Sequence, residues 1–147
     1  MPCVDGSTDC LSTALQAIRA RTEATVTHAS ACVDGPACNT LNTSDAIAAA
    51  KASDVSILIV GLKYSGEGTK GGEPTNGEGT DRHSITLPGK QQALCEAVIA
   101  VGKPTVLVLI GGGSISVGFA KAHQAVSIIS MASGGQAGAQ ALSEVLM

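Results

Sequence analysis

Long apolar runs separated by polar, glycine-rich loops are the dominant pattern along this chain. Two runs, Val55–Val60 and Thr105–Ile110, are almost continuously hydrophobic, and Ala125–Met131 repeats the pattern less strictly. Strands that are buried on both faces of a parallel sheet have this composition, whereas half-exposed strands alternate polar and apolar positions. We therefore expect three buried strands in one parallel sheet.

Segments with a helical spacing of apolar residues alternate with these strands. The expected helices are Thr8–Arg21, Asp45–Ala52 with Ser44 as its N-cap, Lys90–Val101 and Gln136–Met147. We also expect a short strand at Ala24–His28 and an extended piece at Ile115–Phe119. Alternating strands and helices with right-handed crossovers predict an α/β fold, a three-layer α/β/α sandwich with a mainly parallel sheet. One domain is expected over residues 1–147, with only a loose assignment of residues 1–24.

Composition adds an unusual core and excludes two classes of partner. The 147 residues are 44% hydrophobic but include one Tyr, one Phe and no Trp, so aliphatic side chains must build the core. The formal net charge is −3 and no cluster of Lys and Arg occurs, which argues against nucleic-acid binding and against acidic membranes. The apolar runs are too short to span a bilayer.

The cysteines favour an oxidising setting. Cys32 and Cys38 enclose a loop-like Val-Asp-Gly-Pro-Ala sequence and are the candidate disulfide, while the total of five leaves at least one thiol unpaired within the chain. No Cys-x-x-Cys pair occurs, so zinc binding and thioredoxin-type chemistry are both poorly supported. We expect neither a metal site nor a cofactor. Cys95 is expected to be a buried thiol on a helix. A glycosylation sequon at Asn42 points in the same extracytoplasmic direction.

Three loops follow the three expected strands and should meet at one edge of the sheet. They are Lys63–Pro88, Gly111–Ser114 and Ser133–Gln136. Parallel strands end at the same edge, and ligands of open α/β sheets bind there. We therefore place the candidate site at this carboxyl edge.

Two kinds of chemistry are poorly supported at that edge. The run Gly111–Ser114 lacks both the Gly-Lys-Ser/Thr ending of a phosphate loop and GxGxxG spacing, so a tight strand exit that needs glycine is the better interpretation. No serine stands in a GxSxG elbow. The histidines show no ligand spacing and are expected at the surface: His28, His83 and His123.

Carboxylates are better candidates for catalytic residues at this edge. The loop Lys63–Pro88 contains four of them, Glu67, Glu73, Glu78 and Asp81. Glycoside cleavage uses two carboxyl groups, one to protonate the leaving oxygen and one as nucleophile or base. A solvated loop without chemistry is the alternative, and the loop sequence alone leaves it open.

Several motifs, taken together, carry a family resemblance. Residues 78–92 contain Glu-Gly-Thr-Asp-Arg, then Leu-Pro-Gly-Lys-Gln-Gln, similar to the Glu-x-x-Asp-Arg…Leu-Pro-Gly-x-Gln-Gln stretch of glycoside hydrolase family 3 β-xylosidases, particularly plant-type ones. Lys103–Leu109 resembles that family's Pro-Val-Val-Leu-Val-Leu strand, and Val117–Lys121 its Val-x-Phe-Ala-Lys. Ser114 stands where the family has Pro, and Ser116 where it has Asp. The chain from about Thr25 onward resembles the C-terminal α/β domain of these enzymes.

The resemblance implies a retaining exo-glycosidase acting on an oligosaccharide outside the cell or in the cell wall. An N-terminal barrel domain would carry the Asp nucleophile, and this domain would lend the acid/base carboxyl. Glu78 holds the Glu-x-x-Asp-Arg position and is the first candidate. Glu67 is the second, because Ser65–Gly68 loosely resembles the acid/base loop of related β-glucosidases. Asp81 and Arg82 are expected to fix the loop.

The chain itself contains no barrel segment, so we expect it to be a fragment of a longer enzyme and to be inactive alone. The alternative is a non-catalytic structural or assembly domain derived from this family, with possible self-association. The scarcity of aromatic residues argues against strong sugar binding by that alternative.

Overall fold

A computed structural model of the chain describes residues 11–64, 75–76 and 82–147. The chain forms two compact units, one of Ala29–Ala132 and one of Met1–His28 with Ser133–Met147. Each unit is described by itself below. The predicted acid/base residues, Glu67 and Glu78, lie outside the described residues.

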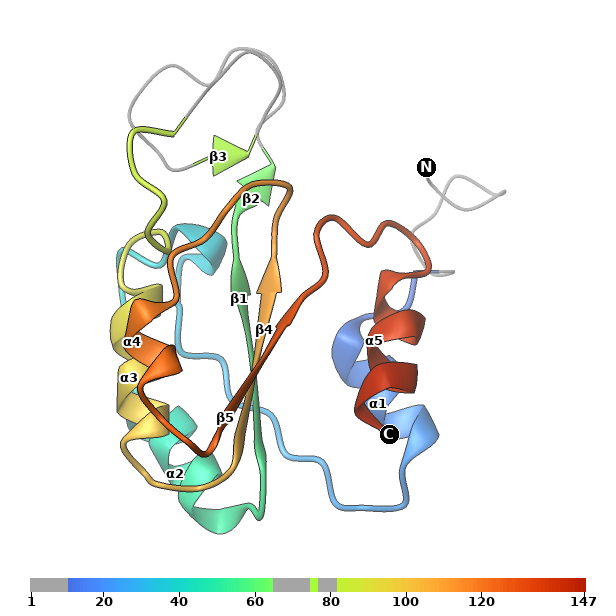
Figure 1. Cartoon of the computed structure of the whole chain (residues 1–147). Coiled ribbons are helices and arrows are strands. Elements are labelled where there is room, and N and C mark those ends of the chain that lie inside the picture. Colours follow the sequence, from blue (N-terminus) through green and yellow to red (C-terminus); the bar gives the residue numbers. More distant parts are fainter. Residues whose placement is uncertain (1–10, 65–74, 77–81) are drawn as a thin grey trace. The chain divides into compact units, whose positions relative to one another are not determined.

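The larger unit is built on a three-stranded parallel sheet (Figure 1). Its strands are β1 (Ser56–Gly61), β4 (Thr105–Ile110) and β5 (Val126–Ser130), in the order β1-β4-β5. Leu58, Leu107 and Ile128 stand at the same level of the three strands. The apolar runs thus form the expected parallel sheet, and the α/β class is confirmed.

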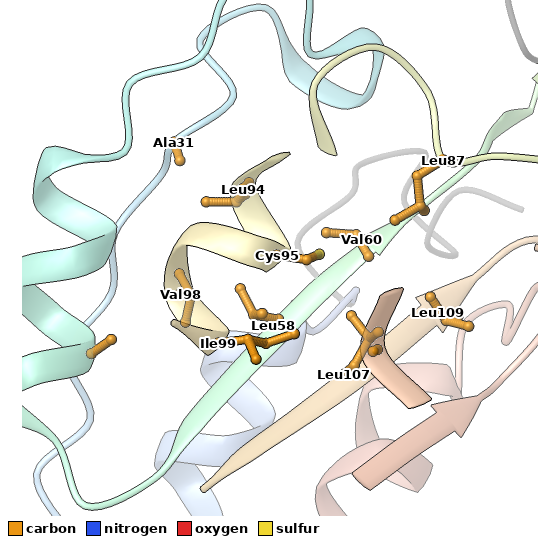
Figure 2. Packing of buried hydrophobic residues seen from close by; sticks show 12 residues of the cluster. Ala31, Leu58, Val60, Leu87, Leu94, Cys95, Val98, Ile99, Leu107 and Leu109 are labelled. Carbon is orange, nitrogen blue, oxygen red and sulfur yellow. The ribbon is translucent and has the colours of Figure 1, made fainter. Parts of the chain in front are cut away.

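Helices α2 (Ser44–Ala52), α3 (Gln91–Ile99) and α4 (Gly118–Lys121) lie on one face of this sheet (Figure 1). The apolar side chains of α3 meet those of β1 and β4 in one buried cluster (Figure 2). Leu107 and Cys95 are fully buried in it, so the expectation of a buried Cys95 is confirmed. Aliphatic side chains supply nearly all of this core, as the composition requires.

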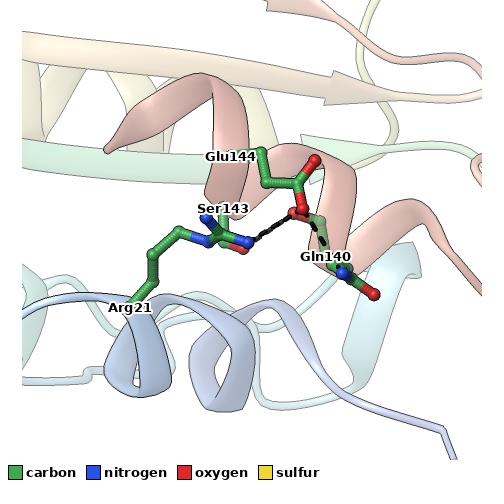
Figure 3. Close-up of polar contacts among 4 residues, drawn as sticks. All are labelled: Arg21, Gln140, Ser143 and Glu144. Carbon is green, nitrogen blue, oxygen red and sulfur yellow. Dashed lines mark hydrogen bonds and ion pairs between the residues drawn. The ribbon is translucent and has the colours of Figure 1, made fainter.

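In the smaller unit, α1 (Ala14–Arg21) packs against α5 (Gly138–Leu146). A capping box between Thr13 and Gln16 begins α1. Arg21 of α1 reaches Glu144 of α5, with 2.8 Å between Nη2 and Oε1 (Figure 3). Both side chains are largely exposed, so this ion pair contributes at most about 1 kcal/mol.

Three local predictions were wrong. Ala24–His28 forms no strand, because no neighbouring strand pairs with its β-branched residues. The segment Ile115–Phe119 is interrupted by helix α4, whose first turn is closed by bonds from the Ala120 and Lys121 amides to the Val117 carbonyl. The N-cap of α2 is Thr43 rather than Ser44.

Short elements also occur where only loops were expected. A 3-10 turn, η1, spans Gly35–Ala37. The two-residue strands β2 (Lys63–Tyr64) and β3 (Thr75–Asn76) pair in parallel with each other, apart from the main sheet.

Candidate functional site

The carboxyl edge of the sheet is held together by backbone bonds that continue past the strand ends. The Leu62 amide donates to the Ile110 carbonyl at 2.8 Å, and the Gly111 amide donates to the Ala132 carbonyl at 3.1 Å. The exits of β1, β4 and β5 are therefore tied to one another. Ser133–Gln136, the third loop expected at this edge, belongs to the smaller unit.

Two glycines allow this close approach. A Cβ on Gly61 would lie 1.9 Å from the Ile110 carbonyl oxygen, and a Cβ on Gly111 would lie 2.9 Å from the side chain of Leu62. Both distances are too short for any real Cβ. The need for glycine at position 111 is therefore a matter of packing at a strand exit, which agrees with the tight-exit interpretation rather than with a phosphate loop.

The segment that begins at Arg82 lies against the loop after β4. The Arg82 guanidinium donates to the Ser114 carbonyl and, at 3.5 Å, to the Thr86 carbonyl. The Ser116 amide donates to the Ile85 carbonyl at 2.7 Å. The described partners of Arg82 are thus two backbone carbonyls, one on the loop after β4 and one in its own segment. Asp81 lies outside the described residues.

A small oxidised loop borders the same edge. Cys32 and Cys38 form a disulfide, which confirms that candidate pair. The Asp34 carboxylate closes the loop by accepting hydrogen bonds from the Asn39 amide at 2.9 Å and the Thr40 amide at 3.1 Å. The Thr40 bond and then the Asn39 bond lower the pKa of Asp34 below its ordinary value of 3.8, because they stabilise the charged form.

The first residue of α3 joins this loop to β1. The Gln91 side chain is 3% exposed. It accepts a bond from the Gly61 amide at 2.8 Å and donates to the Gly61 carbonyl at 2.9 Å and the Pro36 carbonyl at 2.6 Å. Sequence reasoning missed this residue. The available signal was a glutamine in the first turn of a helix that is otherwise apolar toward the core.

The remaining candidate residues are exposed or lie outside the described part. Glu67 and Glu78, the acid/base candidates, are outside it. Asn42 is exposed, and its Oδ1 accepts bonds from the amide and hydroxyl of Ser44. The three histidines are exposed, as expected: His28, His83 and His123.

The buried thiol and the search for metal ligands complete the chemistry of the described part. Burial raises the pKa of Cys95 to about 12, so it stays protonated at neutral pH. Within residues 11–64, 75–76 and 82–147, no three His, Cys, Asp or Glu side chains gather as metal ligands would. The helices described there are all too short or too polar to cross a membrane.

The parallel sheet and the contacts at its carboxyl edge define an open α/β domain whose candidate site lies where the strands end. A family model described as the C-terminal domain of glycosyl hydrolase family 3 matches residues 3–147. The chain therefore belongs to this family, and the resemblance drawn from its motifs is confirmed.

Its relatives are much longer proteins. It is 40% identical over 121 residues to probable beta-D-xylosidase 6 of Arabidopsis thaliana, covering 81% of this chain and 14% of that protein. It is 34% identical over 111 residues to beta-xylosidase/alpha-L-arabinofuranosidase 1 of Medicago sativa, covering 74% of this chain and 13% of that protein. The chain thus spans about one seventh of the length of these curated relatives.

A solved structure gives the same family. It is a family 3 exo-beta-xylosidase in complex with a xylobiose aziridine activity-based probe, with a TM-score of 0.58 and 30% sequence identity. The match covers 71% of this chain and 12% of that one.

Proposed function

We propose that this chain is the C-terminal domain of a retaining exo-glycosidase that hydrolyses β-xylosides or related β-glycosides. The observation that carries the proposal is the family match over nearly the whole chain. Relatives that are named β-xylosidases, and the exo-β-xylosidase structure with a xylobiose-derived probe, support the substrate class.

In this proposal Glu78 is the acid/base residue. It protonates the departing glycosidic oxygen and then takes a proton from the water that attacks the glycosyl-enzyme intermediate. Support comes from its motif and from its neighbour in the sequence, Arg82, whose guanidinium binds the Ser114 carbonyl at the carboxyl edge. Glu67 is the second candidate for the same role.

The nucleophile must come from elsewhere. Retaining hydrolysis needs two carboxyl groups about 5–5.5 Å apart. We assign the second to an N-terminal barrel domain of the longer enzyme, so the isolated chain should be inactive toward an oligosaccharide. The chemistry uses these two carboxyl groups and neither metal nor cofactor.

An extracellular or cell-wall location follows as part of the proposal. A disulfide between Cys32 and Cys38 persists in oxidising compartments and is rare in the cytosol. Asn42 is exposed, as a glycosylated residue must be.

The test joins the chain to the N-terminal domain of a related β-xylosidase and compares three variants. Glu78→Gln should lower kcat on alkyl β-xylosides by about 10²–10⁴-fold, the range of general acid–base catalysis. The loss should be smaller on nitrophenyl xyloside, because that leaving group needs little protonation. Glu73→Gln, a carboxylate in the same loop, is the matched control and should stay near the unaltered fusion.

The leaving-group dependence decides between the candidates. The same pattern in Glu67→Gln, with Glu78→Gln active, would move the role to Glu67. An inactive unaltered fusion that binds xylobiose no better than the isolated chain would contradict the enzymatic proposal and favour an assembly role.

A further inference from the structure

Neither the helix α3 nor the apolar core requires a buried glutamine at position 91. Gln91 is the first residue of α3, where an exposed Glu or Ser would serve the helix equally well. Yet its side chain is buried, with both of its amide hydrogens and its oxygen bonded to backbone atoms. Burying an amide without such bonds costs about 1–3 kcal/mol, so all three bonds must be kept.

Two of the bonds replace a missing strand. In the described sheet β1 is an edge strand, so the side of it that faces away from β4 has open amide and carbonyl groups. At Gly61 the Gln91 side chain pairs with both of these groups, at 2.8 and 2.9 Å, as a neighbouring antiparallel residue would. The last residue of β1 is therefore fixed from both sides, by β4 and by Gln91.

The third bond connects this strand end to the disulfide loop. The Gln91 Nε2 donates to the Pro36 carbonyl at 2.6 Å, and the neighbouring Lys90 amide donates to the Cys38 carbonyl at 2.8 Å. Gly89 permits the approach, since a Cβ there would lie 2.1 Å from the Ala37 carbonyl oxygen. The start of α3 thus packs closely against the backbone of the disulfide loop.

We propose that Gln91 is a positioning residue, the centre of a β1 brace formed by Pro36, Gln91 and Gly61, which couples the Cys32–Cys38 disulfide to the exit of β1. Its importance for catalysis rests on the proposed function, because the segment with both acid/base candidates follows this exit in the sequence. An external dithiol reduces the disulfide by thiol–disulfide exchange: Cys32 and Cys38 become thiols and the dithiol becomes a disulfide. This reduction releases the Pro36 carbonyl and loosens the exit. The brace makes the geometry of the carboxyl edge sensitive to the redox state of a loop more than fifty residues away in sequence from Gln91.

Amide hydrogen exchange of the oxidised chain, measured by NMR, tests the brace without enzymatic activity. Gln91→Met removes the acceptor of the Gly61 amide, and we expect that amide to exchange at least about tenfold faster. The Ser56 amide, bonded to the Pro104 carbonyl at the other end of β1, should change by less than about twofold. Gln92→Met is the matched control, since the bond of that side chain within the described part of the chain is to the exposed Glu96, at 2.8 Å.

Reduction of the disulfide in the unaltered chain is the second measurement, and it decides the matter if Gln91→Met does not fold. Reduction should speed exchange at Gly61 by at least about threefold while Ser56 is unchanged. Equal acceleration at both amides in Gln91→Met would make the residue a general stabiliser and overturn the proposal. An unchanged Gly61 rate after reduction would overturn the coupling to the disulfide.

Kinetics of the barrel fusion supply the catalytic readout. Gln91→Met should lower kcat by about tenfold with KM within about threefold, since displacement of a catalytic segment affects the chemical step more than substrate binding. An active fusion whose kcat is unaffected by Gln91→Met would overturn the positioning role. An inactive unaltered fusion would contradict the proposed function instead, and hydrogen exchange would still decide whether the brace exists.

Discussion

Gly61→Ala is the substitution that should damage this domain most through a single methyl group. The new Cβ would lie 1.9 Å from the carbonyl oxygen, 2.7 Å from the carbonyl carbon and 2.8 Å from the amide nitrogen of Ile110. All three are backbone atoms of the central strand, which cannot turn aside as a flexible side chain can. Carbon–oxygen contacts are ordinarily about 3.3 Å or longer, so β1 and β4 must separate by more than about 1 Å.

That separation has a calculable cost. It breaks the 2.8 Å bond from the Leu62 amide to the Ile110 carbonyl and disturbs the Gln91 bonds to Gly61, each bond contributing about 0.5–1.5 kcal/mol. An alanine at the Gly61 φ of 157° adds backbone strain of about 1–3 kcal/mol. Together these contributions give an expected loss of about 2.5–7.5 kcal/mol in the free energy of unfolding, a large part of a typical domain's stability.

Two other glycines separate these contributions. Gly102 has a φ of +81° and no atom within 4 Å of the place where a Cβ would lie, so Gly102→Ala should show backbone strain alone, about 1–2 kcal/mol. Gly118, in helix α4, has neither positive φ nor a close neighbour, so Gly118→Ala should be neutral or stabilise by up to about 1 kcal/mol.

Urea unfolding followed by far-ultraviolet circular dichroism measures all three free energies. The order of stability should be Gly118→Ala, then Gly102→Ala, then Gly61→Ala. Equal losses in Gly61→Ala and Gly102→Ala would refute the reasoning, because the close contact with Ile110 would then cost nothing.

Two titratable groups give further predictions. Because backbone bonds from Thr40 and Asn39 lower the pKa of Asp34, its carboxylate stabilises the fold above the ordinary value of 3.8, and this is lost as pH falls through the lowered folded-state pKa. Asp34→Asn should therefore flatten the acid side of the stability curve below the ordinary pKa of 3.8, and equal slopes in urea titrations would contradict it. Burial raises the pKa of Cys95 to about 12, so its thiol should react slowly in the folded chain. At about pH 8 we expect iodoacetamide to label Cys95 at least about a hundredfold faster in urea than in the folded chain, measured by peptide mapping. Equal labelling rates would count against its burial.

The strands were predictable because burial on both faces leaves a continuous apolar signal. The expected Val55–Val60 became β1 at Ser56–Gly61, and Thr105–Ile110 is β4 with the same bounds. Ala24–His28 has similar β-branched residues but no partner strand, which a local pattern cannot reveal. The Thr43 N-cap was missed for a similar reason, since both Thr43 and Ser44 suit that position by type.

The sequence was enough to predict where the candidate site lies, but not the contacts that its residues make. The site was expected at the carboxyl edge because parallel strands end at the same edge of a sheet. The acid/base roles of Glu78 and Glu67, on the loop after β1, were inferred from the family motifs and remain predictions. The glutamine in the first turn of α3 was a signal for a buried polar residue, but its partners are three backbone groups from two distant segments, which no spacing within α3 identifies. The disulfide was predictable because its two cysteines are close in sequence and enclose loop-forming residues.

Crowded and strained backbone positions in the larger unit gather at this same edge. Glycines that would clash if they carried a Cβ stand at the exits of β1 and β4, at Gly61 and Gly111, and beside the disulfide loop at Gly89. The two non-glycine residues with positive φ among those described, Cys38 and Ala132, offer carbonyls to the Lys90 and Gly111 amides at these contacts. Gly102, by contrast, has positive φ with open space around it.

Strain of this kind persists only where surrounding contacts hold it in place, and such positions cluster at functional sites. A fold that needed the sheet merely as a hydrophobic core would have no reason to crowd one end of it. At the exit of β1 the backbone of Ile110 leaves no room for a side chain on Gly61, and one buried glutamine pairs with the same glycine. At the exit of β4, Gly111 packs against the side chain of Leu62. Under the proposed function, this arrangement would hold the loop that carries the acid/base carboxylate in a fixed position.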